Sequence, residues 1–77
     1  MLSFDNNKNG NYKIFSKNTG KVILEKNYLN NLLDGKYIYY WDNGQVRFFG
    51  MFSQNHRVGT WTNYDKNGEV VFKENFN

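Results

Sequence analysis

The chain has 77 residues, enough for one small domain and too few for an additional cofactor-binding domain. Its 10 basic and 7 acidic residues give a net charge of +3, but the basic residues are scattered among acidic ones without a basic block, as on a solubilising surface. The absence of cysteine excludes disulfides and cysteine-based zinc sites. No apolar run approaches the roughly 20 residues of a membrane-spanning helix, and the first residues lack a signal-peptide pattern. We therefore expect a cytoplasmic protein.

Glycines recur at a fixed interval in two sets. The first set is Gly20, Gly44 and Gly68 and the second is Gly35 and Gly59, and the spacings 44 − 20, 68 − 44 and 59 − 35 all equal 24. Repeats of 20 to 50 residues are typical of arrays in which neighbouring units build a shared core. The interval predicts a single domain over residues 1–77. Its repeat units are residues 12–35, 36–59 and 60–77, with boundaries that are approximate.

Each first-set glycine follows a turn-like segment, and these segments read KNTG, WDNG and DKNG. Asn-Gly between apolar runs favours a hairpin with a type I′ turn, because both residues tolerate positive φ. The fold class is therefore all-β, an antiparallel array of three β-hairpins with a 24-residue repeat. The segments NNLLDG and SQNHRVG are predicted to be connectors, and NYLNNLL a local lid on the sheet. The predicted strands are residues 12–16, 21–28, 36–41, 45–52, 60–64 and 69–76.

One face of the predicted strands keeps its apolar character in all three units. Positions two, four and eight residues after each first-set glycine are apolar or aromatic, and even spacing places them on one face of a regular strand. On the preceding strand, Tyr37 recurs as Trp61 and Tyr40 as Tyr64. These two positions are three residues apart, so a bulge or a strand end must separate them. The predicted core residues are Val22, Val46, Val70, Leu24, Phe48, Phe72, Tyr28, Phe52 and Phe76.

The opposite face is apolar in the second unit alone, and its composition predicts a protein-binding surface. Large rings with Met and Arg are typical of interaction hot spots. The alternative is that Leu2 and Phe4, or the NYLNNLL segment, cover this face. Arg57 is a second choice for a polar contact. The five residues of the predicted binding cluster are Tyr39, Trp41, Arg47, Phe49 and Met51.

Candidate catalytic or metal-binding groups are few, and we predict none of either. His56 is the only histidine and stands in a predicted connector, where a solvated side chain is the ordinary state. Asp34 and Asp65 stand in predicted turns, where Asp is expected to bind backbone N–H groups. The glycine spacing matches neither a P-loop nor a dinucleotide-binding motif. We therefore expect no cofactor and no enzymatic activity.

The segment YIYYWDNGQVRFFGMFSQNHRVGTWTNYDKNGEVVFKENF resembles the MORN-repeat variant pattern, with elements such as YYxNGQ and GxFxNxxxxGxW. The resemblance covers about two thirds of the chain and implies a curved antiparallel sheet of successive hairpins. Members of that family bind proteins or, in some cases, phospholipid surfaces, and bacterial variants are often labelled antitoxins. The resemblance implies structural roles for Gly20, Gly35, Gly44, Gly59, Gly68, Tyr40, Trp61 and Tyr64.

The leading functional hypothesis is a non-enzymatic protein-binding module, an antitoxin-like inhibitor or adaptor that masks a partner protein. The alternative is a peripheral phospholipid- or anion-binding module, and nucleic-acid or nucleotide binding comes third. The last predicted strand has no proline or dense charge to prevent edge pairing. A homodimer through this C-terminal edge strand is therefore a further hypothesis.

Overall fold

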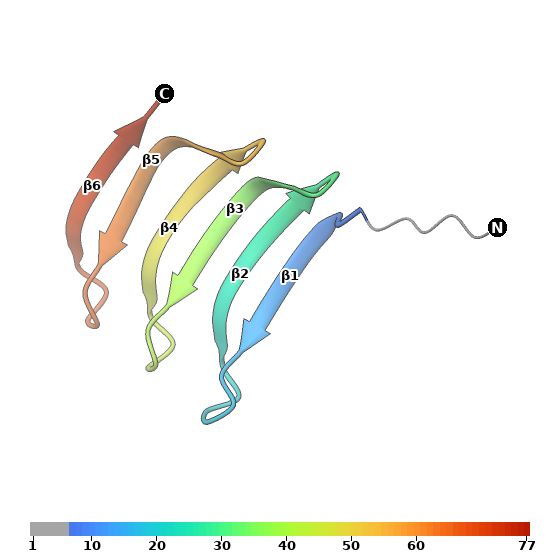
Figure 1. Ribbon diagram of the computed structural model, residues 1–77. Coiled ribbons are helices and arrows are strands. Elements are labelled where there is room, and N and C mark those ends of the chain that lie inside the picture. The colour runs from blue at the N-terminus through green and yellow to red at the C-terminus, as the bar shows by residue number, and fades with distance from the viewer. Residues whose placement is uncertain (1–6) are drawn as a thin grey trace.

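The computed structural model describes residues 7–77, which form one six-stranded antiparallel sheet with the strands side by side in chain order (Figure 1). Residues 7–77 contain no helix, so the predicted all-β fold class is confirmed. The predicted cover by Leu2 and Phe4 lies outside the described residues. The strands are β1 (Gly10–Phe15), β2 (Val22–Leu29), β3 (Leu32–Tyr40), β4 (Val46–Ser53), β5 (His56–Tyr64) and β6 (Val70–Phe76).

The sheet is a single layer. The principal extents of the Cα trace are 53 × 36 × 10 Å, and a second layer would add about 10 Å to the smallest of them. Within residues 7–77 the buried hydrophobic core consists of Trp61, whose side chain is 6% exposed. Stability therefore depends on ring contacts along one face and not on a core between layers.

The loops that carry Gly44 and Gly68 are three-residue hairpin loops. In the first, the Trp41 N–H donates to the Gln45 carbonyl at 2.7 Å and the Gly44 N–H to the Trp41 carbonyl at 3.0 Å. Gly44 has φ 91°, whereas Asn43 has negative φ. This is a type I turn closed by a left-handed glycine, so the predicted type I′ turn is wrong here. The Asn43 side chain favours the type I turn by accepting the Gln45 N–H at 2.9 Å.

The type I′ turns lie instead between the hairpins. Asn30 and Asn31 have φ 50° and 73°, and Gln54 and Asn55 have φ 48° and 69°, so each pair forms a two-residue turn. The predicted connectors and the NYLNNLL lid are therefore wrong, because asparagine reaches the left-handed region at low cost and lets the strands continue. The predicted unit boundaries at 35/36 and 59/60 fall inside β3 and β5.

A register shift interrupts each hairpin near its loop. In the second hairpin Tyr39 pairs with Phe48 but Tyr40 pairs with Val46, so Arg47 is an extra residue on β4. The predicted bulge or strand end between Tyr37 and Tyr40 corresponds to this register shift between Tyr39 and Tyr40, but the extra residue lies on β4 and β3 itself continues to Tyr40. Because two residues of β4 now face one residue of β3, the Val46 and Phe48 side chains lie on opposite faces of the sheet.

The first hairpin is one residue out of phase with the others. Ile14 pairs with Leu24 in the way that Tyr39 pairs with Phe48, although the residue one repeat before Tyr39 is Phe15 and not Ile14. The loop between β1 and β2 compensates with one more residue than the loop between β3 and β4. The departure of the first hairpin from the repeat pattern therefore comes from its loop length.

Candidate binding surface

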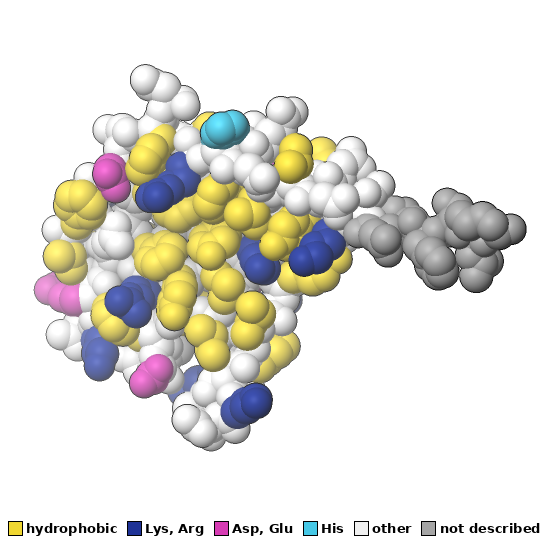
Figure 2. Space-filling model, viewed as in Figure 1, with side chains coloured by type: hydrophobic (Ala, Val, Ile, Leu, Met, Phe, Trp, Pro, Cys, Tyr) yellow, Lys and Arg dark blue, Asp and Glu magenta, His cyan; other side chains and the backbone are white. Residues whose placement is uncertain are grey.

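Aromatic rings on one side of β3 to β6 form a connected cluster, which we call the aromatic face. The Tyr37 and Phe52 ring centroids are 5.1 Å apart, those of Phe52 and Trp61 are 5.2 Å apart, and those of Tyr37 and Trp61 are 5.8 Å apart. Figure 2 shows apolar side chains gathered across the middle of the sheet. The aromatic face consists of Tyr37, Tyr39, Phe48, Phe52, Trp61, Phe72 and Phe76.

A glycine makes the centre of this face possible. The Trp61 indole lies directly on Gly50, where an added Cβ would stand 1.9 Å from the ring atom Cδ2. The indole Nε1 donates to the Met51 carbonyl at 3.1 Å. Because this donor is satisfied and the ring is enclosed, Trp61 is a fixed support on which the neighbouring rings pack.

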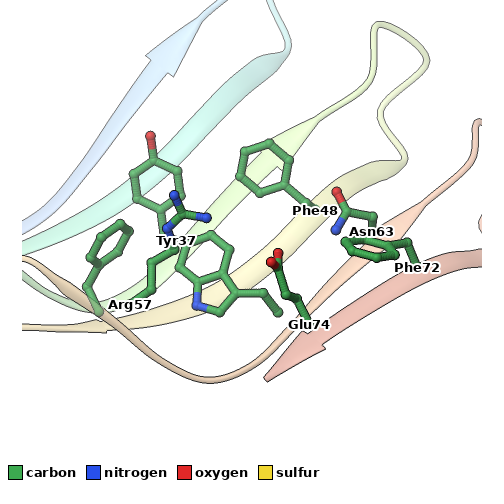
Figure 3. Close-up of a pocket in the computed structure, with 8 residues that line it drawn as sticks. Tyr37, Phe48, Arg57, Asn63, Phe72 and Glu74 are labelled. Carbon is green, nitrogen blue, oxygen red and sulfur yellow. The ribbon is translucent and has the colours of Figure 1, made fainter. Parts of the chain in front are cut away.

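A hollow of about 370 Å³ opens on the aromatic face beside Trp61 (Figure 3). Its rings come from β3 to β6, and polar groups surround them. The Arg57 guanidinium carbon lies 5.7 Å from the Trp61 ring centroid and 5.1 Å from that of Phe76, within the range of cation–π attraction. The lining residues are Tyr37, Phe48, Phe52, Arg57, Asn63, Phe72, Glu74 and Trp61.

A second group lies near the hairpin loops, and we call it the Trp41 cluster: Tyr39, Trp41, Arg47 and Lys66. The Arg47 guanidinium carbon is 4.5 Å from the Trp41 ring centroid and 5.4 Å from that of Tyr39. Lys66 Nζ is 5.4 Å from the Trp41 centroid. The Trp41 Nε1 donates to the Tyr64 carbonyl at 3.1 Å, which links the second hairpin to the third.

The structure brings three of the sequence-predicted binding residues together. Tyr39, Trp41 and Arg47 all belong to the Trp41 cluster. The bulge explains why Arg47 reaches the Tyr39 and Trp41 rings. Arg47 is the extra residue opposite Tyr39, and its side chain lies on the same face of the sheet as that of Tyr39. Arg57 lies apart from them, at the Phe76 end of the aromatic face.

The other two predicted binding residues lie on the opposite face. Phe49 pairs with Ile38 and Met51 pairs with Lys36, and these positions alternate with Phe48 and Tyr39. The prediction that all five residues share one face is therefore wrong. Counting alternate residues outward from the hairpin loop places Tyr39 and Phe49 on one face only if the pairing of β3 with β4 is continuous. The register shift between Tyr39 and Tyr40 interrupts that pairing, so the two side chains lie on opposite faces.

The hollow itself was missed by sequence reasoning. Phe48, Phe52 and Phe72 were predicted as core residues, but the sheet that carries them is a single layer over residues 7–77. Phe72 shows the consequence, since its side chain is 52% exposed. The available signal was that residues 12–76 all belong to strands and turns of one array, so no segment among them remains to pack on this face.

On the opposite face Tyr40 forms a polar contact with Glu25. Burial raises the pKa of the Tyr40 hydroxyl above its ordinary value, and the charge and hydrogen bond of the Glu25 carboxylate raise it further. The Asn11 side-chain amide donates to the same carboxylate at 3.0 Å. This network joins β1, β2 and β3, and it gives the tyrosine of the repeat pattern a structural role.

Residues 7–77 contain no group of three acidic, histidine or cysteine side chains arranged to hold a metal ion. His56 is exposed at the first position of β5, and the Asp65 carboxylate accepts the N–H groups of Asn67 and Glu69. Over the same range no helix is long and apolar enough to cross a membrane. Comparison of the chain with protein-family models, curated proteins and solved structures finds no match.

Proposed function

We propose that the chain is a non-enzymatic binding module that holds another protein against its aromatic face. The observation that carries the proposal is a hollowed surface built from aromatic side chains, over which residues 7–77 place no second layer. An exposed apolar surface of this kind marks an interaction site in many proteins. Rings that are already packed on Trp61 lose little conformational freedom on binding.

The polar groups around the hollow favour a protein partner. Arg57, Glu74 and Asn63 line it together with the rings, so positive, negative and neutral hydrogen-bonding groups surround an apolar floor. Protein interfaces have this arrangement of an apolar centre and a polar rim. A lipid or nucleic-acid surface would instead favour cations throughout.

The resemblance to the MORN-repeat variant pattern is consistent with this function. Its bacterial members suggest the more specific proposal that binding masks a functional surface of the partner, as an antitoxin masks a toxin. This part rests on the sequence pattern and on analogy of fold.

The test is affinity capture from the native host lysate with two variants that differ in the face they alter. Phe72 belongs to the aromatic face and Met51 to the opposite face, and their side chains are 52% and 40% exposed. We expect Phe72→Ala to lose a stoichiometric partner and Met51→Ala to retain it, at low and high salt. Loss with Met51→Ala alone would contradict the proposal and assign binding to the opposite face. Circular dichroism must first show that both variants are folded.

A second candidate function is anion or phospholipid-headgroup binding at the Trp41 cluster. The observation that favours it is a hollow of about 350 Å³ beside Trp41, whose charged lining residues are the cations Arg47, Lys66 and Lys21 and the single anion Asp42. Sedimentation with vesicles of anionic or neutral phospholipid tests it. Binding to anionic vesicles alone, weakened by salt and by Lys66→Gln, would support this candidate.

A further inference from the structure

Each type I′ turn is tied to the preceding hairpin by the asparagine at its second position. The Asn55 N–H donates to the Leu33 carbonyl at 2.9 Å, and the Leu33 N–H donates to Asn55 Oδ1 at 2.7 Å. Asn31 makes the same two bonds with Lys8, at 3.0 and 2.7 Å. We call this pair of bonds the asparagine clamp. The clamp appears twice, and its asparagines stand at equivalent positions of successive repeats.

The receptor half of the clamp consists of backbone groups alone. Leu33 pairs with Tyr28 beside the closing pair Leu29 and Leu32 of its turn. In an antiparallel ladder the pair next to a hydrogen-bonded closing pair is not hydrogen-bonded, so its N–H and C=O groups point outward. The outward groups of Leu33 are the ones that the Asn55 clamp occupies.

Arg57 occupies the same position in the third hairpin. It pairs with Phe52 beside the closing pair Ser53 and His56, and it stands one repeat after Leu33 in the sequence. Its N–H and C=O therefore point away from β4 for the same geometric reason. No asparagine among residues 7–77 clamps them: the pairing of β5 with β6 ends at Gly59 and Phe76.

Open space adjoins this third receptor. A hollow of about 600 Å³ is lined by Arg57, Phe76 and Asn77, among others. β6 forms the adjacent edge of the sheet and has a partner on one side only. Val71 and Phe72 on this strand are among the most exposed large apolar residues that the structure describes. A receptor, a cavity and an unpaired strand thus lie together along one edge.

We propose that this edge accepts an extended strand of a partner protein, which enters through a tight turn carrying asparagine or aspartate. The side-chain oxygen of that residue accepts the Arg57 N–H and its backbone N–H donates to the Arg57 carbonyl, as in the two clamps already present. The strand then pairs with β6, and its alternate side chains lie over Phe72 and Phe76. Strand addition of this type gains affinity from main-chain hydrogen bonds and specificity from alternate side chains.

The proposal goes beyond the proposed function, because a partner could cover the aromatic face without touching the edge of β6. It also states the chemistry of the partner segment. The residue that enters at Arg57 is Asn or Asp, and the following strand is apolar at every second position. Residues 54–64 of this chain supply such an asparagine, Asn55, followed by the strand that occupies the equivalent place beside β4.

The experiment uses a labelled synthetic peptide of residues 54–64, QNHRVGTWTNY, added to the intact chain. We expect saturable binding, with amide NMR shifts at Arg57 and along β6. A matched peptide with Asn55→Ala loses the oxygen that accepts the Arg57 N–H, and we expect it to bind about tenfold more weakly. A peptide with Asn55→Asp keeps an acceptor, and we expect it to bind like the parent.

Three outcomes of the peptide experiment would overturn the proposal. The first is equal affinity of the parent and Asn55→Ala peptides, the second is a set of shifts confined to β1, and the third is no binding at millimolar peptide. Dimerisation of the chain without peptide uptake would also overturn it and assign the edge to a second copy. A Phe72→Ala chain that keeps its captured partner, while the peptide still binds, would remove the proposed function and leave the edge proposal standing.

Discussion

β4 and β6 carry Val and Phe at the same positions of the aromatic repeat pattern, yet these residues are buried to different degrees on the two strands. Phe48 and Val46 on β4 are half-buried, whereas Phe72 and Val70, their counterparts one repeat later on β6, are 52% and 53% exposed. β4 has a strand on both sides and β6 has one neighbour. In a one-layer sheet, burial is thus supplied by adjacent strands and not by residue type.

The comparison also separates stability from binding. The central strands carry most of the rings that pack on Trp61, whereas the edge strand β6 exposes Val70 and Phe72 to solvent. A residue type that stabilises the sheet at its centre is therefore expected to be available for partner binding at the equivalent position of the edge strand. The following predictions test this division, and they run from the largest expected effect to the smallest.

Gly50→Ala should have the largest effect. The new methyl group would overlap the Trp61 indole, so the ring must leave its place, and we expect a loss of about 3 kcal/mol in the free energy of unfolding. A core of this size supplies only about 3 to 5 kcal/mol, so the variant should be largely unfolded in a denaturant titration. Glu74→Ala, at the equivalent edge position, is the control and should change stability by less than about 0.5 kcal/mol. Equal stability of the two variants would contradict the central role of Trp61.

The same truncation at two equivalent positions sharpens the comparison directly. Phe48→Ala removes contacts with Tyr39 and Trp61, whose ring centroids lie 5.2 and 6.0 Å away, and we expect a loss of about 2 to 3 kcal/mol. Phe72→Ala should cost about 1 kcal/mol or less, since the side chain is already largely hydrated. Denaturant midpoints measured under one condition decide the matter. Similar losses would mean that β6 is covered in solution.

Substitutions of Asn55 test the asparagine clamp between the second and third hairpins. Asn55→Gly keeps the positive φ but removes the acceptor for the Leu33 N–H, and we expect a loss of about 1 kcal/mol. Asn55→Ala adds backbone strain and should lose about 2 kcal/mol, while Asn55→Asp should stay close to the parent. Asn31→Gly should cost less than Asn55→Gly, because Lys8 is exposed and water can replace the lost bond. Thermal or chemical unfolding of the four variants gives the order, and an Asn55→Gly chain as stable as the parent would refute the clamp.

The smallest effect concerns Tyr40 at alkaline pH. Its folded-state pKa is raised by burial and by Glu25, so the unfolded chain loses this proton first as the pH rises. The contribution of Tyr40 to the free energy of unfolding is therefore complete below its ordinary pKa of about 10. It is lost as the pH rises from there through the folded-state pKa. Unfolding titrations between pH 8 and 11 should show that the free energy of unfolding falls less steeply with pH for Tyr40→Phe than for the parent. Identical slopes would mean that the Glu25 contact has no energetic effect.

The sequence was sufficient for the fold class and for most strand positions, because the hairpin loops repeat and the apolar residues keep their spacing. It placed the turns less well. Asn-Gly at residues 43–44 suggested a type I′ turn, but the Asn43 side chain holds a type I turn in competition with it. The Asn-Asn pair at residues 30–31 forms the type I′ turn without any glycine, and propensity alone does not distinguish these cases.

The binding surface was predicted only in part. Trp41 and Arg47 were selected for their composition, and they do lie together. Their separation from Phe49 and Met51 depends on a one-residue shift that side-chain alternation does not reveal. The exposure of Phe72 depends on the absence of a neighbouring strand among the described residues, which is a property of the sheet and not of its repeating sequence.

The order of the strands has a consequence for the kinetics of folding. Every strand pairs with the strand next to it in sequence, so each pairing closes only a short loop and the contact order is low for an all-β protein. Loop-closure entropy then opposes folding weakly. Structure can begin in any hairpin and spread to its neighbours one strand at a time, as in other linear arrays. We therefore expect refolding faster than that of a sandwich of equal size, with the rate set by the hairpin that forms around Trp61.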